Sequence, residues 1–164
     1  MTIYIKNKYR LQVDDFTFKC CIGKNGLSKK KREGDKKTPA GTFEIENLYY
    51  RPDRIKKPLT KLKCIKIKKN MGWCDDPRSK KYNQLIEFPF GFRAEKMYLK
   101  ENTYDIVVVI NYNMKPAIPK KGSAIFLHLA KKNYSSTKGC IAISKKNMKL
   151  LLSNIKKKTY LNII

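Results

Sequence analysis

A histidine and a cysteine stand close together in the segment HLAKKNYSSTKGC, which runs from His128 to Cys140. His128 is the only histidine in the 164-residue chain. A thiolate is a strong nucleophile and an imidazole can remove the proton from a thiol, so these residue types predict a nucleophilic pair. Gly139 supports this prediction, because a residue without a Cβ permits a tight turn that aims the N–H groups of Gly139 and Cys140 at one oxyanion. The hydroxyls of Ser136 and Thr137 lie in the same loop and could orient the imidazole or the substrate.

Other interpretations of this segment stay open. Cys140 could be an inert core thiol, and His128 a core histidine bonded to a backbone carbonyl. A metal site would need two further ligands, and the five cysteines contain no CxxC pair that would supply them. The adjacent acids Asp75 and Asp76 are more typical of a turn than of the converging carboxylates that a glycosidase needs.

The segments that must position these residues are mostly typical of β-strands. Residues 16–22 alternate with a period of two, which places Cys20 in the core and Cys21 on the outer face. We expect the segment that contains His128 and the segment after Cys140 to pair as antiparallel neighbours, which would bring both side chains to one edge. Residues 106–110 are apolar and β-branched, which indicates a strand buried on both faces. Further strands are expected within residues 42–45, 62–68 and 123–130.

One segment carries a clear helical pattern. Its apolar side chains recur at i, i+3, i+4 and i+7, at Met148, Leu151, Leu152 and Ile155. Ser144 precedes them as a candidate N-cap, since its hydroxyl can accept a hydrogen bond from a backbone N–H of the first turn. These patterns predict a single domain over residues 1–164 that is mainly β with a C-terminal helix.

Two long polar loops, residues 23–41 and 73–83, are candidates for carrying function on such a scaffold. The start of the chain, MTIYIKNKYR, is interrupted by charge and lacks the apolar region of a secretory signal peptide. Taken alone, this feature predicts a cytoplasmic protein, or one that is exported by another route. No stretch approaches the ~20 apolar residues of a membrane span, so we expect no transmembrane segment.

The net charge of the chain is strongly positive, at +25. Such a charge attracts polyanions, which include nucleic acid, anionic lipid and acidic cell-wall polymers. A lysine-rich composition without any such partner is an equal alternative, because the lysines are spread along the whole chain. Nucleic acid is the weaker candidate partner, since the sequence contains no RNP motif, helix-turn-helix pattern or zinc finger.

The segment STKGCIAI resembles the nucleophile motif of the L,D-transpeptidase catalytic domain, the YkuD-like family. The resemblance extends along the chain in the expected order. REGDKKTPAGTFEI (residues 32–45) is similar to the family's TP-x-G-x-F segment. Later blocks resemble one bacterial branch of the family: WCDDPRSKKYN, YDIVVVINYN and GSAIFLHLA.

The resemblance implies a β-sandwich or barrel-like catalytic fold and a role for each matching residue. By it, Cys140 is the nucleophile and His128 the general base and acid. Gly139 and Cys140 supply oxyanion donors, and Thr137 and Ser136 support them. Contacts with substrate are expected from four further side chains: Lys138, Trp73, Tyr82 and Arg32.

The resemblance also implies a substrate class. Family members attack a tetrapeptide stem of peptidoglycan, release its terminal D-alanine and hold the rest as a thioester. The amine of a second stem then forms a cross-link, which makes the expected activity a cysteine acyltransferase of cell wall biogenesis in the periplasm or cell envelope, without cofactor or metal. The alternatives are an L,D-carboxypeptidase-type hydrolase of the same fold and a non-catalytic basic module that binds an anionic polymer.

The chain departs from the family pattern at three points. Lys138 stands where many members carry His, and Ala142 where many carry Arg or Asn. The interval from His128 to Cys140 is also shorter than in many members. We expect these positions to distinguish the substrate contacts of this chain from those of other members.

Overall fold

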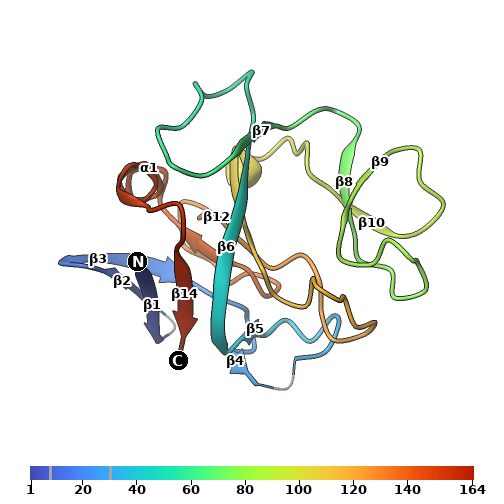
Figure 1. The fold of residues 1–164 in the computed structure, drawn as a ribbon, viewed down its shortest axis with the longest axis horizontal. Coiled ribbons are helices and arrows are strands. Elements are labelled where there is room, and N and C mark those ends of the chain that lie inside the picture. The colour runs from blue at the N-terminus through green and yellow to red at the C-terminus, as the bar shows by residue number, and fades with distance from the viewer. Residues whose placement is uncertain (8, 30) are drawn as a thin grey trace.

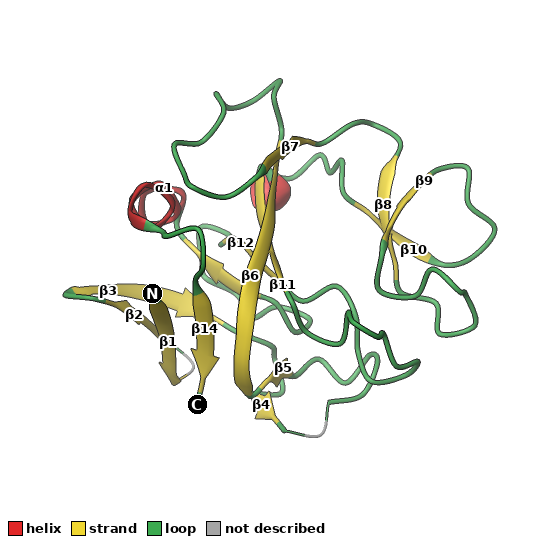
Figure 2. Cartoon of the chain, viewed as in Figure 1, coloured by secondary structure: helices red, strands yellow, loops and turns green. Residues whose placement is uncertain are grey.

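The computed structural model describes residues 1–7, 9–29 and 31–164. The chain is mostly β, with one short α-helix near its C-terminal end (Figure 1, Figure 2). The main sheet has nine strands in the order β11-β12-β13-β3-β2-β1-β14-β6-β7. Their bounds are β1 Thr2–Asn7, β2 Arg10–Val13, β3 Phe16–Cys21, β6 Gly41–Tyr50, β7 Cys64–Lys66, β11 Ile106–Ile110, β12 Phe126–Leu129, β13 Ile141–Ile143 and β14 Tyr160–Ile163.

The main sheet closes on itself through one long strand. β6 pairs with β14 over Gly41–Glu44, and it also pairs with β11 between Ile45 and Tyr50. This second pairing joins the two ends of the strand order and produces a barrel-like sheet, with β7 as an extra strand beside β6. The mainly β fold expected from the sequence is therefore confirmed.

Strand β11 separates two apolar cores. Ile106, Val108 and Ile110 belong to the core inside the barrel. Val107 and Val109 point the other way, into a second core on the outer face of the barrel. Both faces are buried, which confirms the interpretation of this apolar run and explains its lack of polar residues.

The second core is covered by a small antiparallel sheet, which lies apart from the helix in Figure 1. It consists of β8 (Met71–Cys74) between β9 (Leu85–Glu87) and β10 (Ala94–Lys96). The short parallel pair β4 (Leu27–Ser28) and β5 (Thr38–Pro39) and the 3-10 helix η1 (Asn102–Tyr104) complete the structure.

Helix α1 (Lys145–Asn154) follows the apolar pattern of the sequence, and Met148, Leu151 and Leu152 are buried. The Ser144 hydroxyl accepts a hydrogen bond from the backbone N–H of Asn147, which confirms the N-cap. Within the described ranges, no helix has the length and apolar character needed to cross a bilayer.

The last strand, β14, was not expected from the sequence. In β14, Leu161 and Ile163 are fully buried and alternate with more exposed neighbours. The strand pairs in parallel with β1 and so joins the two ends of the chain in one sheet (Figure 1). The alternation in YLNI was a signal for it, although only four residues long.

Two expectations about strands were wrong. β12 and β13 pair in parallel, with His128 opposite Ala142, because residues 130–140 carry the chain back before β13 begins. The antiparallel neighbour of β13 is β3 instead. Cys21 is buried rather than outward, because it lies opposite Ala142 and its Sγ is 3.8 Å from the Ala142 carbonyl oxygen.

Candidate active site

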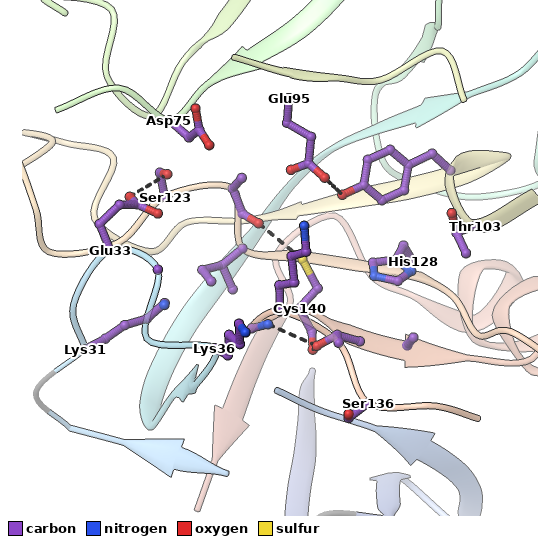
Figure 3. Close-up of a pocket in the computed structure, with 18 of the residues that line it drawn as sticks. Lys31, Glu33, Lys36, Asp75, Glu95, Thr103, Ser123, His128, Ser136 and Cys140 are labelled. Carbon is purple, nitrogen blue, oxygen red and sulfur yellow. Dashed lines mark hydrogen bonds between the residues drawn. The ribbon is translucent and has the colours of Figure 1, made fainter. Parts of the chain in front are cut away.

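A cavity of about 760 Å³ opens where the end of the barrel meets the small sheet, and both Cys140 and His128 line it (Figure 3). His128 lies on β12, and Cys140 immediately precedes β13. Because these strands are parallel neighbours, the side chains reach the cavity from adjacent parts of one sheet. The cavity wall also contains the other residues expected in this loop: Ser136, Thr137, Lys138 and Gly139.

The Cys140 thiol is held by two backbone groups of a neighbouring segment. It donates a hydrogen bond to the carbonyl oxygen of Ala124 at 3.2 Å and accepts one from the N–H of Phe126 at 3.4 Å. Burial, and then the charge of Glu95, raise the pKa of the thiol to about 12. Cys140 is therefore a neutral thiol at neutral pH, and it needs a base to become a nucleophile.

His128 is the imidazole on the same cavity wall. Its Nδ1 lies 3.0 Å from the carbonyl oxygen of Leu129. Since a carbonyl can only accept, Nδ1 carries the proton and Nε2 keeps its lone pair. Burial lowers the pKa of the imidazole to about 4, so it is neutral and able to accept a proton. The ring of Tyr104 packs against it, with centroids 5.3 Å apart.

The turn before Cys140 needs glycine. Gly139 has φ +143°, and a Cβ at this position would stand 2.9 Å from the carbonyl oxygen of Lys37. Thr137 fixes the turn from within, since its hydroxyl donates to the Cys140 carbonyl at 2.6 Å and accepts from the Gly139 N–H at 3.1 Å. The Gly139 N–H is thus already engaged, contrary to the expectation that it serves an oxyanion. The N–H of Cys140 is the remaining candidate donor.

Thr38 supports the same turn from a distant segment. Its buried hydroxyl accepts from the N–H of Gly23 at 2.9 Å and donates to the carbonyl of Gly139 at 2.8 Å. The TPAG segment resembles the family pattern, but no role was expected for Thr38 itself. The structure shows that this segment clamps the backbone before Cys140.

A basic loop beside the cavity is organised by one carboxylate. Asp35 accepts hydrogen bonds from the N–H groups of Arg32 and Lys37 and forms an ion pair of 2.8 Å with the buried Lys31. Arg32 contributes its backbone to this loop but is not among the described residues that line the cavity. The expectation of a substrate contact from the Arg32 side chain thus gains no support from its position.

Comparison with known proteins agrees with this geometry. The model of the L,D-transpeptidase catalytic domain, YkuD, matches residues 1–163. The chain belongs to the L,D-transpeptidase family. Members of this family act on peptidoglycan peptides, typically in the cell envelope. A comparison with curated proteins found no match.

Two solved structures share the fold of this L,D-transpeptidase family member. Both are of Pgp2 from Campylobacter jejuni, described as a helical cell shape determining protein. The first is 18% identical, with a TM-score of 0.50, and the match covers 99% of this chain and 46% of that one. A point mutant of Pgp2 gives 18% identity, a TM-score of 0.50, and 99% and 45% coverage. This chain thus spans less than half of the Pgp2 chain.

The aromatic residues expected to contact substrate lie behind the cavity. Trp73 is buried in the second core against Phe126, and its indole N–H donates to Asn83 at 2.9 Å. The hydroxyl of Tyr82 donates to Glu33, which does line the cavity. Neither Trp73 nor Tyr82 is among the described lining residues, so each supports the cavity wall from behind.

Asn83 is a supporting residue that was not expected from the sequence. Its Oδ1 accepts from the Ala124 N–H at 3.0 Å, and its Nδ2 donates to the carbonyls of Tyr112 and Asn113. In this L,D-transpeptidase family member, Ala124 is also the residue whose carbonyl holds the Cys140 thiol. Asn83 ends the quoted block WCDDPRSKKYN, which was the available signal for it.

Proposed function

We propose that this L,D-transpeptidase family member forms a thioester between Cys140 and the third residue of a peptidoglycan tetrapeptide stem, releasing the terminal D-alanine. The observation that carries the proposal is the neutral thiol and the neutral imidazole on one cavity wall. The family membership supplies the substrate class. The proposed place of action is the cell envelope.

The proposed reaction begins with proton transfer. The Nε2 of His128 accepts the proton of the Cys140 thiol as the sulfur attacks the carbonyl carbon of the third residue. The negative charge that develops on the carbonyl oxygen is stabilised by the Cys140 N–H. When the tetrahedral intermediate collapses, the C–N bond to D-alanine breaks and the imidazolium returns its proton to the departing amine.

The second half of the reaction restores the enzyme. An amine from another stem attacks the thioester, His128 accepts a proton from that amine, and the Cys140 sulfur leaves with a proton. The product is then a cross-linked peptide, and the protein is a transpeptidase. If water attacks instead, the product is a shortened stem and the protein is an L,D-carboxypeptidase-type hydrolase.

The test is a stem assay read by mass spectrometry. Purified protein is incubated with a tetrapeptide stem, and the intact mass should increase by the mass of the stem minus the mass of the released D-alanine. The Cys140→Ser variant should show no thioester, and Cys64→Ser, which changes a partly exposed thiol outside the cavity, should behave as wild type. A cross-linked dimer identifies the transpeptidase, and a tripeptide alone identifies the hydrolase.

A carbapenem offers a second probe of the same nucleophile, because this class of compound acylates the cysteine of many family members. A covalent adduct that maps to Cys140 and is lost in Cys140→Ser supports the enzyme. If folded wild-type protein gives neither a thioester with the stem nor a carbapenem adduct, the proposal is wrong.

The net charge of +25 favours a second candidate, a basic module that binds an anionic polymer without catalysis. Binding would then be unchanged in Cys140→Ser and would fall steeply as salt is raised. The enzyme predicts the opposite pattern, in which Cys140→Ser abolishes turnover at every salt concentration.

A further inference from the structure

The cavity contains a carboxylate with a position unlike that of the other acids around it. Glu95 lies on β10 and lines the cavity together with Cys140 (Figure 3). Its Oε1 accepts a hydrogen bond of 2.9 Å from the hydroxyl of Tyr104. Within the described residues, no cationic nitrogen lies within salt-bridge distance of it. Glu95 is therefore a carboxylate held in place but not neutralised.

The other two carboxylates that line the cavity are engaged by the protein. Asp75 pairs with Arg93 at 3.0 Å. Glu33 accepts hydrogen bonds from the hydroxyls of Tyr82 and Ser123. Asp75 already has a cation, and Glu33 accepts two hydroxyl hydrogen bonds where Glu95 accepts one, so Glu95 keeps the most acceptor capacity for a charged group of the substrate.

Glu95 is exposed at the surface of the cavity, although protein groups still crowd around its carboxyl. Burial raises the pKa of its carboxyl, and the charges of Asp75 and Glu33 act in the same direction. The Tyr104 hydroxyl and the charge of Lys138, from the loop before Cys140, act in the opposite direction. An ammonium group brought by a ligand would find in Glu95 a carboxylate that faces the cavity without a protein cation, and the low-dielectric wall would strengthen their attraction relative to bulk water.

Glu95 also acts on the nucleophile. Its charge is the largest electrostatic cause, after burial, of the raised pKa of the Cys140 thiol, while Lys31 acts weakly in the opposite direction. Tyr104 connects the parts of the site, because its ring packs on His128 and its hydroxyl holds Glu95. A cation placed on Glu95 would therefore remove a charge that disfavours the thiolate.

We propose that Glu95, held by Tyr104, binds an ammonium group of the substrate and thereby couples substrate binding to activation of Cys140. The inference rests on the proposed function, since it assigns the cation to the acyl-donor peptide. It makes Glu95 a specificity-determining residue and Tyr104 a positioning residue. In the free enzyme the thiol stays protonated and unreactive, and a substrate that carries the cation in the right place relieves this restraint.

The first test needs no turnover. Cys140 is alkylated with iodoacetamide at pH 8, and peptide mass spectrometry separates it from the other cysteines. Glu95→Gln keeps an oxygen that can accept from Tyr104 but removes the charge that raises the pKa of the Cys140 thiol, so alkylation should be about tenfold faster than in wild type. Glu87→Gln makes the same change on β9 of the same small sheet, outside this cavity, and should leave the rate unchanged.

A small cation then probes the coupling directly. Nα-acetyl-lysine amide should accelerate alkylation of wild-type Cys140 several-fold and have no effect on Glu95→Gln. Its side-chain-acetylated analogue, which has no charge, should have no effect on either protein. Equal alkylation rates in wild type and Glu95→Gln, or stimulation that persists in Glu95→Gln, would overturn the inference.

The second test uses stems whose third residue has a free or an acetylated side-chain amine. Wild type should prefer the free amine in kcat/KM, and Glu95→Gln should lose this preference. Tyr104→Phe should raise KM for the free amine more than it lowers kcat, which a purely structural defect would not do. If no stem reacts with wild type, the proposed function fails, while the alkylation result still decides the role of Glu95. If stems react but Glu95→Gln keeps the wild-type preference, the inference alone fails.

Discussion

The hydroxyl of Thr38 donates a hydrogen bond of 2.8 Å to the carbonyl oxygen of Gly139, which lies 101 positions away in the sequence. The same hydroxyl accepts from the N–H of Gly23. One buried side chain thus ties the loop after β3, the short strand β5 and the turn before Cys140 into one unit. The position of the nucleophile depends on a segment that never touches it.

Replacing this hydroxyl should loosen the turn. Thr38→Val keeps the shape of the side chain but leaves the Gly139 carbonyl and the Gly23 N–H without their partner. We expect the free energy of unfolding to fall by about 2 kcal/mol, the cost of unsatisfied buried groups. The rate of Cys140 acylation should fall at least about tenfold, because small displacements of reacting groups are costly. Urea unfolding and stopped-flow mass analysis measure the two effects.

The matched control is Thr42→Val, because Thr42 is exposed on β6. Its stability should stay within about 0.5 kcal/mol of wild type and its acylation rate should be unchanged. If Thr38→Val were as active and stable as Thr42→Val, the turn would not depend on this hydroxyl.

Gly139→Ala should damage the turn more directly. The φ of +143° is a conformation that alanine rarely adopts, and its Cβ would stand 2.9 Å from the Lys37 carbonyl oxygen. We expect a loss of about 3 kcal/mol in unfolding free energy and no detectable thioester with the stem. The measurement is chemical unfolding together with intact mass after incubation with substrate.

Gly91→Ala provides the comparison, because a Cβ at Gly91 meets nothing within 4 Å and the residue has no positive φ. It should be as stable and as active as wild type. An active Gly139→Ala would mean that the backbone before Cys140 tolerates another conformation.

Local patterns in the sequence predicted those features that depend on local chemistry. The apolar run at residues 106–110 gave a strand buried on both faces, and Ser144 gave the helix start. The sequence also predicted that His128 and Cys140 lie close together, with Gly139 in the turn before the cysteine. The structure places all three in the wall of one cavity. Each of these predictions uses a pattern of a few neighbouring residues, because burial and backbone geometry directly restrict which residue types can stand there.

Features that depend on distant contacts could not be read from the sequence. The parallel pairing of β12 with β13 is set by where the intervening loop crosses, which no strand pattern encodes. Thr38 and Asn83 matter through hydrogen bonds to residues more than 40 positions away. Glu95 sits on a short strand of mixed character and gains its importance only when that strand is folded against the cavity.

Asn83 should stabilise the segment that holds the thiol. Its side chain satisfies the Ala124 N–H, the Trp73 indole and two backbone carbonyls. Because its φ is +58°, Asn83→Gly removes these bonds without adding backbone strain. We expect a loss of about 3 kcal/mol in unfolding free energy, since several buried groups lose partners at once. Acylation of Cys140 should slow as well, because the Ala124 carbonyl is no longer fixed.

Asn70→Gly is the corresponding control on an exposed turn, where the side chain makes one hydrogen bond of 3.2 Å to Glu87. The loss of unfolding free energy in Asn70→Gly should stay within about 1 kcal/mol, the usual effect of the backbone flexibility of glycine. Urea unfolding of the two variants measures the difference, and equal costs would rule out a special role for Asn83.

His128 should make the stability of the protein depend on pH in a defined direction. Burial lowers the pKa of its imidazole from 6.5 to about 4, with the Leu129 carbonyl opposing the shift. Between these values the unfolded chain binds a proton that the folded chain does not, so stability is greatest above pH 6.5 and is lost as the pH falls toward 4. The contribution of this one group is about 3 kcal/mol.

His128→Gln cannot bind this proton. On acidification, the unfolding free energy of wild type should therefore fall by that amount relative to the unfolding free energy of the variant. Urea unfolding of both proteins at several pH values from 7.5 to 4 measures it, with the other ionisable groups common to both. Parallel pH profiles of the two proteins would show that His128 is not a buried neutral base. The proposed proton transfer from Cys140 would then lack an acceptor.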